Sequence, residues 1–267
     1  MIRYSARLAM LASLLLTTAG CDGSDSQAQS GCSVGSLRGA YIYAQDGFTI
    51  AGEMASQRTP FAQAGRETFN GDGTMSGVAT ANFNGALVRL TYSGTYTVQP
   101  NCTGAVTFTD GDGAVSHYDI AIEDGGAEFG FVQTDANVVT AAFERRRTAS
   151  QASCSLVTLK GNYVYAGDGF DVAGDGSTQR TPFATAGREV YAGDGTLSGT
   201  DTTSTNGVAA RTTYTSTYTV NADCTGTYVY NTDPTNPYDL FVDPSGAEFA
   251  YVAAGANRVA AGYERRR

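Results

Sequence analysis

The chain contains one long segment twice, and this internal repeat limits the possible folds more than any other feature. The repeat is clearest where AGRETFNGDGTMSG at 64–77 returns as AGREVYAGDGTLSG at 186–199. The similarity runs without a gap over 32–104 and 154–226, and resumes after a short deletion up to the ERRR sequence that ends each copy. Such a unit is far longer than the ~20–50 residues of a solenoid repeat. The repeat therefore predicts tandem duplication of a whole domain.

The repeat boundaries give the domain organisation that we expect for the folded part of the chain. The first domain covers 32–147 and the second covers 154–267, and 148–153 form the linker between them. Each domain is long enough to bury a core of its own.

Alternation of apolar and polar residues predicts that each domain consists of β-strands. Gly71-Asp72-Gly73 separates two alternating segments, and Gly supplies the positive φ that a tight hairpin turn needs. In the first domain the strands are expected near 39–45, 61–70, 74–83, 87–98, 103–109, 115–123, 127–133 and 138–146. Short links without a helical segment favour an all-β fold of two tandem eight-stranded antiparallel up-and-down β-barrels. The longest connection, Asp46 to Pro60, is expected to form a lid.

The charge and cysteine content restrict the partners of the chain. Its net charge is -9, which argues against a nucleic-acid partner because such partners need clustered Lys and Arg. One His and the lack of a close Cys pair predict no metal site, and no cofactor is expected. Four of the five cysteines fall two per repeat, and among the three possible pairings the repeat selects Cys32–Cys102 and Cys154–Cys224.

The N-terminus has the features of a targeting segment. Arg3 and Arg7 precede a short apolar run at 8–16, and Leu-Thr-Thr-Ala-Gly-Cys follows at 16–21. This sequence resembles the lipobox of bacterial lipoproteins, which implies that Cys21 is lipidated after removal of a signal peptide at 1–20. Residues 21–31 would then be a flexible tether, and the protein would be a membrane-anchored lipoprotein of the cell envelope that faces the periplasm or the exterior. The alternative is an ordinary signal peptide.

Short motifs in each repeat resemble those of the calycins, the lipocalin and avidin group of barrels. Gly39-Ala40-Tyr41 and Gly161-Asn162-Tyr163 stand where calycins have Gly-x-Trp at the start of the first strand. In the last strand Arg145 shares a side with Val139, Ala141 and Phe143, and Arg265 is its counterpart. The resemblance implies that Arg145 packs over Tyr41 and Arg265 over Tyr163 to close one barrel end. It also implies an open end and a ligand.

Several inward or loop residues are candidates for a binding site. Glu67 shares a strand face with Phe61 and Phe69 and is expected to point inward, as is Glu189 in the second copy. Each is either a ligand-orienting group or general base, or a hydrogen-bonded core group. Arg58 and Arg180 would hold an anion at the barrel mouth or anchor the lid. The remaining candidates either line an amphipathic cavity or are plain core; these are Tyr43, Tyr92, Tyr165 and Tyr214.

Three functions are compatible with these patterns. The first is a non-enzymatic envelope protein in which each barrel binds a small amphipathic or apolar ligand. The second is a module that binds a protein partner through its loops, as an inhibitor or an envelope scaffold. The third is an enzyme resembling barrel-shaped cyclases and isomerases, with Glu67 and Glu189 as acid–base groups. A cavity of about 300 Å³ or more that is open at the lid end favours a ligand, whereas a packed interior with an exposed apolar loop patch favours a partner.

Overall fold

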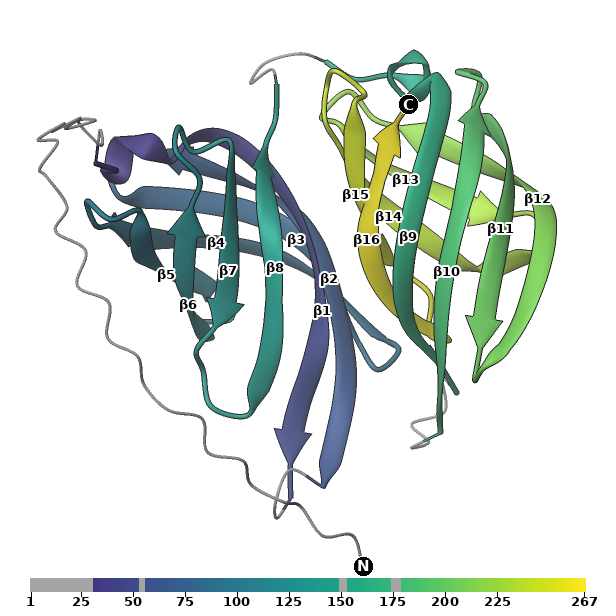
Figure 1. Ribbon diagram of the computed structural model, residues 1–267, viewed down its shortest axis with the longest axis horizontal. Helices are drawn as coiled ribbons and strands as arrows, with labels where there is room; N and C mark the ends of the chain where they lie inside the picture. The colour runs from purple at the N-terminus through teal and green to yellow at the C-terminus, as the bar shows by residue number, and fades with distance from the viewer. Residues whose placement is uncertain (1–30, 53–55, 149–152, 174–178) are drawn as a thin grey trace, which may run out of the picture. The chain divides into compact units, whose positions relative to one another are not determined.

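The computed structural model describes residues 31–52, 56–148, 153–173 and 179–267, which form two closed antiparallel barrels of eight strands (Figure 1). The predicted fold class is therefore confirmed, and each barrel contains one disulfide. The predicted signal peptide, the lipidation site Cys21 and most of the tether and linker lie outside the described residues. No helix within the described ranges is long and apolar enough to cross a membrane.

Barrel 1 begins with a short 3-10 helix, η1 (Val34–Ser36), that precedes the strands. Its strands are β1 (Arg38–Ala51), β2 (Gln57–Asn70), β3 (Thr74–Phe83), β4 (Ala86–Val98), β5 (Thr103–Asp110), β6 (Val115–Ile122), β7 (Glu128–Gln133) and β8 (Val138–Arg146). Each strand pairs with its neighbour along the chain, and β1 also pairs with β8 to close the barrel. The predicted strand positions agree with these bounds except at the first hairpin.

Barrel 2 repeats the same order after η3 (Leu156–Leu159). Its strands are β9 (Gly161–Val172), β10 (Arg180–Tyr191), β11 (Thr196–Thr205), β12 (Val208–Val220), β13 (Thr225–Tyr230), β14 (Asp233–Val242), β15 (Glu248–Ala253) and β16 (Arg258–Arg266). β9 pairs with both β10 and β16, so this barrel is closed as well.

The connection expected to form a lid is mostly strand. β1 and β2 stay in register from Arg38 opposite Asn70 to Ala51 opposite Gln57. The segment that reads as a loop in the sequence contains Phe48, Thr49 and Ile50, whose side chains suit an extended strand. The lid prediction is therefore wrong for the described residues of this connection.

The disulfides connect the segment before the first strand of each barrel to the turn between its fourth and fifth strands. Cys32 is bonded to Cys102 and Cys154 to Cys224, and each bond closes a loop with a sequence separation of 70. Both predicted pairings are confirmed. In the chain-entropy model a loop of this size contributes about 4 kcal/mol to stability.

One barrel end is closed by an arginine stacked on a buried tyrosine, but the arginine is not the predicted one. The Arg146 guanidinium lies 5.4 Å from the Tyr41 ring centroid, and its Nε donates to the Tyr41 hydroxyl at 3.0 Å. Arg266 contacts Tyr163 in the same way, 5.5 Å from the ring. The predicted Arg145 and Arg265 point outward instead and pair with Glu128 and Glu248; they alternate with the inward arginines along the same strands.

The two barrels share an apolar cluster between their outer surfaces. Barrel 1 contributes outward side chains of β1 and β2, and barrel 2 contributes those of its last three strands together with Val172 at the end of β9. The buried members are Ile42, Ala44, Ala62, Ala64, Val172, Phe241, Ala250, Val252 and Val259. This contact explains why outward positions of β16 are apolar.

Candidate functional site

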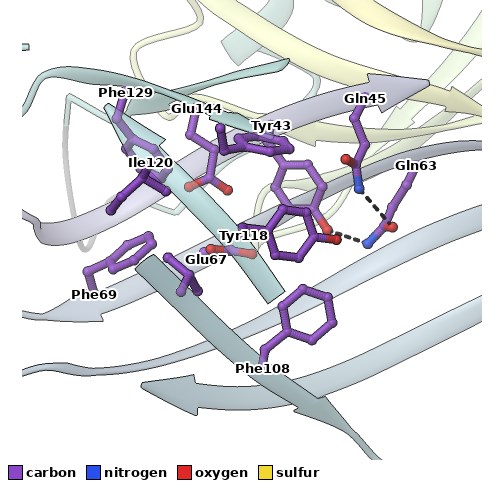
Figure 2. Close-up of a pocket in the computed structure, with 12 residues that line it drawn as sticks. Tyr43, Gln45, Gln63, Glu67, Phe69, Phe108, Tyr118, Ile120, Phe129 and Glu144 are labelled. Carbon is purple, nitrogen blue, oxygen red and sulfur yellow. Dashed lines mark hydrogen bonds between the residues drawn. The ribbon is translucent and has the colours of Figure 1, made fainter. Parts of the chain in front are cut away.

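A pair of buried carboxyl groups lies in the interior of barrel 1. Glu67 on β2 is 8% exposed and Glu144 on β8 is 2% exposed, and Figure 2 shows both side chains in the same pocket. Burial raises the pKa of Glu67 to about 7, and burial together with the neighbouring Glu67 raises the pKa of Glu144 well above its ordinary value. The two carboxyls are within hydrogen-bonding reach of each other. Because two adjacent buried carboxylates repel each other, the pair holds at least one proton at neutral pH.

A chain of hydrogen bonds connects this pair to Gln45 and Gln63 in the middle of β1 and β2. The Tyr92 hydroxyl donates to Glu67 Oε1 at 2.7 Å and lies 3.1 Å from the Tyr43 hydroxyl. Gln63 Nε2 donates to the Tyr43 hydroxyl at 2.5 Å, and Gln45 Nε2 donates to Gln63 Oε1 at 3.1 Å (Figure 2). The space left among these side chains is a cavity of about 30 Å³. A cavity of this size holds about one water molecule, so the interior of barrel 1 is packed.

Barrel 2 has the equivalent acid pair, Glu189 and Glu264, which is almost completely buried. The Tyr214 hydroxyl donates to Glu189 Oε1 at 2.7 Å and lies 3.0 Å from the Tyr165 hydroxyl. Tyr191 replaces the Phe69 of the first repeat and donates to Glu264 Oε2 at 3.5 Å. Burial raises the pKa of both acids. Burial therefore favours the protonated form of both groups.

Barrel 2 differs from barrel 1 in that it contains a cavity of about 330 Å³. Gly167 and Thr185 stand where the first repeat has Gln45 and Gln63, and smaller side chains at these positions leave the space open. Aromatic rings form much of the wall; they belong to Phe183, Tyr165, Tyr214, Tyr228, Tyr230, Tyr238 and Tyr251. Hydroxyl groups of Thr185, Thr203, Thr212, Thr213 and Thr232 add polar edges.

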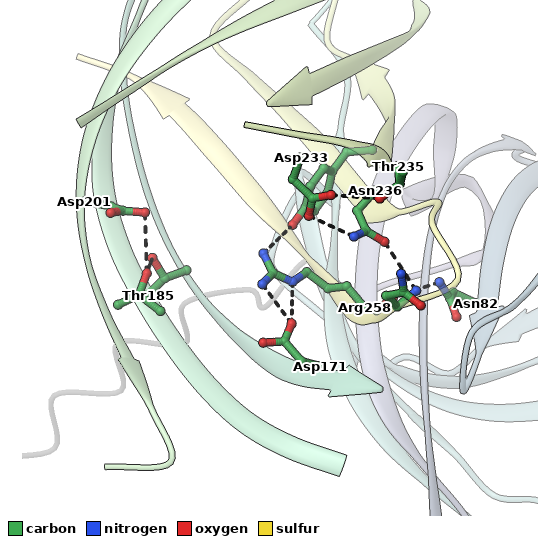
Figure 3. A network of polar contacts seen from close by, with 11 residues as sticks. Asn82, Asp171, Thr185, Asp201, Asp233, Thr235, Asn236 and Arg258 are labelled. Carbon is green, nitrogen blue, oxygen red and sulfur yellow. Dashed lines mark hydrogen bonds and ion pairs between the residues drawn. The ribbon is translucent and has the colours of Figure 1, made fainter. Parts of the chain in front are cut away.

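Charged residues also line this cavity, and they carry an excess of acids. Arg258 lies 4.6 Å from the centroid of the Phe183 ring and forms an ion pair with Asp171 at 2.8 Å (Figure 3). Asp201 accepts hydrogen bonds from Thr212 and from Tyr165, the latter at 3.3 Å. Among the described residues no Lys or Arg forms an ion pair with Asp201. The cavity therefore presents aromatic surface together with hydrogen-bond acceptors.

The predicted tyrosines lie on the inner faces, and the predicted acids do too. Tyr43 and Glu67 line the small cavity of barrel 1, and Tyr92 is buried beside it. Tyr165 and Tyr214 line the large cavity, and Glu189 lies behind the Tyr214 hydroxyl.

The two arginines predicted at the barrel mouth line neither of these cavities. Arg58 is exposed, and its carbonyl oxygen accepts a hydrogen bond from Arg180 Nη1 at 2.5 Å. Arg180 Nε donates to Asn84 Oδ1 of barrel 1 at 3.0 Å. The Arg180 side chain and the Arg58 backbone therefore lie at the contact between the barrels.

Sequence reasoning missed four residues of these sites: Glu144, Glu264, Asp201 and Arg258. The ERRR ends contain both glutamates, but the neighbouring Val139, Ala141 and Phe143 suggest the opposite inward face. Asp201 and Arg258 correspond to Ala79 and Val138 in the first repeat, so a comparison of the two copies could have shown them.

One group of potential metal ligands occurs among the described residues, and its chemistry does not suit a metal. It consists of Cys32, Cys102 and Asp124. The two sulfur atoms form a disulfide and are therefore not the thiolates that bind metals.

Fold and site together define a protein with two tandem eight-stranded barrels, one packed and one hollow. No family model and no curated protein matches the chain. Among solved structures it is similar to a DUF3598-family protein of unknown function from Nostoc punctiforme PCC 73102, at 12% identity and a TM-score of 0.25 over 87% of this chain and 97% of that chain. It is also similar to isotype 1 transferrin binding protein B from serogroup B Neisseria meningitidis, at 8% identity and a TM-score of 0.29 over 87% and 75%. These TM-scores are too low to carry an inference about function.

Proposed function

We propose that this chain is a lipid-anchored binding protein of the cell envelope whose second barrel binds a small amphipathic molecule. The observation that carries the binding role is the cavity of about 330 Å³ in barrel 2. This volume falls within the range of about 300–1,000 Å³ typical of small-molecule sites. The anchor rests on the lipobox resemblance that ends at Cys21.

The lining supports an amphipathic ligand over a purely apolar one. Six tyrosines surround the cavity and present both ring surface and hydroxyl groups. Asp201 and the threonines supply acceptors and donors for polar groups of the ligand. A ligand with one flat apolar part and polar substituents would satisfy both kinds of surface.

We assign the ligand to barrel 2 alone, whereas the sequence suggests one ligand in each barrel. The cavity of about 30 Å³ in barrel 1 is too small for an organic molecule. Gln45 and Gln63 occupy the space that is open in barrel 2. In this proposal barrel 1 is a packed domain that binds no ligand in its interior.

The position of the acid pairs favours binding over acid–base catalysis. Glu189 and Glu264 are absent from the lining of the large cavity, and the Tyr165 and Tyr214 hydroxyls stand between Glu189 and that space. Glu67 and Glu144 share an interior cavity that is too small for an organic substrate, and Glu144 is absent from the second pocket that Glu67 borders, beside Arg66 and Arg147. A catalytic acid must reach the group to which it gives its proton.

The proposal is tested with the neutral fluorescent probe N-phenyl-1-naphthylamine and the full chain in mild detergent. The variant Gly167→Gln with Thr185→Gln places the glutamines of barrel 1 in barrel 2. These side chains fill the cavity, so we expect the probe to bind at least about tenfold more weakly. Fluorescence titration measures the dissociation constant.

The matched control is the reciprocal exchange in barrel 1, Gln45→Gly with Gln63→Thr. This change removes the side chains that fill the first interior, and we expect it to leave binding to barrel 2 intact and to add a second site. Equal probe affinity of the filled variant and the unchanged chain would refute a site in the barrel 2 cavity.

A further inference from the structure

The contact between the two barrels uses a different surface on each barrel. We call the outward side of β1 and β2 in barrel 1 its front face; it contributes Ile42, Ala44, Ala62 and Ala64. We call the outward side of β14 to β16 in barrel 2 its back face; it contributes Phe241, Ala250, Val252 and Val259. The interface is therefore heterologous, front to back.

Polar contacts fix the register of this interface. Thr80 Oγ1 on β3 donates to Asp239 Oδ2 on β14 at 2.7 Å, and Arg89 Nη2 on β4 pairs with the same carboxylate at 3.0 Å. Asn82 Nδ2 donates to the carbonyl oxygens of Ala253 and Gly255, each at 2.9 Å, near the network drawn in Figure 3.

Each barrel, as a copy of the same repeat, also carries the face that the other barrel uses. The back face of barrel 1 is the outward side of β6 to β8, with Ala121, Gly130, Val132, Val139, Ala141 and Phe143. The front face of barrel 2 is the outward side of β9 and β10, with Val164, Ala166, Ala184 and Ala186. Val139 is 56% exposed, whereas its counterpart Val259 is 2% exposed. Two matching apolar faces are thus left uncovered.

The Thr80, Arg89 and Asp239 cluster has counterparts on these uncovered faces, whereas Ser204 stands at the position of Asn82. Asp119 of barrel 1 is the counterpart of Asp239. Thr202 and Arg211 of barrel 2 are the counterparts of Thr80 and Arg89. All three side chains are exposed, so each is available to a second molecule. The back face of barrel 1 and the front face of barrel 2 are therefore both apolar and carry complementary charges, although Ala121 and Gly130 replace the larger Phe241 and Ala250.

We propose that the back face of barrel 1 binds the front face of barrel 2 from a second copy of this chain. The contact repeats the one inside the chain, with Asp119 accepting from Thr202 and pairing with Arg211 of the neighbouring copy. A heterologous contact leaves one free face at each end, so association continues into a ring or a filament. The inference is independent of the ligand proposed for barrel 2.

Sedimentation velocity of the full chain in mild detergent tests this interface. Val139→Glu alters only the back face of barrel 1, and Ala186→Glu alters only the front face of barrel 2. Both residues are exposed within one chain, so folding should be unaffected, and circular dichroism checks it. Between copies each new carboxylate would be buried without a partner, because the counterparts Val259 and Ala64 are buried.

We expect the unchanged chain to sediment as oligomers whose size rises with concentration, and each variant to sediment as a monomer. An equimolar mixture of the two variants should give dimers and nothing larger, because one intact pair of faces remains between them. Val208→Glu, at an exposed position outside both faces, should oligomerise normally. A monomeric unchanged chain, or a mixture that stays monomeric, would overturn the proposal.

Discussion

The Glu67–Glu144 pair makes the stability of barrel 1 fall as pH rises. Burial raises the pKa of Glu67 from an ordinary 4.5 to about 7, so the folded chain binds more protons than the unfolded chain between these values. The free energy of unfolding therefore decreases as pH increases through this range. Ionisation of Glu67 at higher pH costs about 3 kcal/mol of stability.

Glu67→Gln should remove this cost, because glutamine is uncharged and can still accept the hydrogen bond from Tyr92. We expect the variant to match the unchanged chain at pH 5 and to exceed its free energy of unfolding by about 2 kcal/mol at pH 8. Urea unfolding at the two pH values measures the difference. The exposed Glu123→Gln serves as the control and should show no such change. A Glu67→Gln variant that is less stable than the unchanged chain at pH 8 would contradict the raised pKa of Glu67.

The residue-level site was only partly predictable from sequence. Glu67 was expected inward because it alternates with Phe61 and Phe69, and its position follows that pattern. Glu144 and Arg146 were missed because the outward side of the last strand is apolar. In barrel 2 that side is buried against barrel 1, so alternation alone cannot tell a core face from an interface face.

At the level of elements, the last strand of each barrel ties the barrel to its 3-10 helix. Arg266 Nη2 on β16 donates to the carbonyl oxygen of Thr158 in η3 at 2.5 Å and to the Tyr163 hydroxyl at 3.1 Å. The adjacent Arg265 points outward and pairs with Glu248 at 3.4 Å. Arg266 therefore joins the last strand to η3, whereas Arg265 forms an ion pair on the outer side of the barrel.

Arg266→Met should lower the free energy of unfolding by about 2–3 kcal/mol, because it leaves buried hydrogen-bonding groups without their charged donor. Arg265→Met should cost less than about 1 kcal/mol, since it removes a half-exposed ion pair. Denaturant unfolding of the full chain gives both values. Equal losses for the two variants would show that the inward arginine has no special role in closing the barrel.

Strand positions were predictable because turns and alternation are local signals. The Gly71-Asp72-Gly73 turn and the flanking strands follow directly from residue type, and both glycines have positive φ, 81° and 93°. The first hairpin was predicted too short, because the segment from Asp46 to Pro60 mixes strand residues with Gly and Pro. Pairing across 14 residues on each strand was not evident from composition alone.

At the scale of the whole molecule, duplication has produced two barrels with the same strands and different interiors. The open space in barrel 2 lies where Gly167 and Thr185 replace the Gln45 and Gln63 of barrel 1. The sequence contains this difference, but the resulting volume of the interior cavity depends on how the surrounding aromatic rings pack. The contact between barrels was likewise not predicted, because it depends on which outward faces meet.

We infer that one chain binds one small molecule, in barrel 2. Native mass spectrometry of the full chain, isolated in detergent from its own cell envelope, tests this claim most directly. We expect one non-covalent ligand per chain, and none on the variant Gly167→Gln with Thr185→Gln isolated in the same way. No added mass on the unchanged chain, two ligands per chain, or a ligand retained by the filled variant would contradict it.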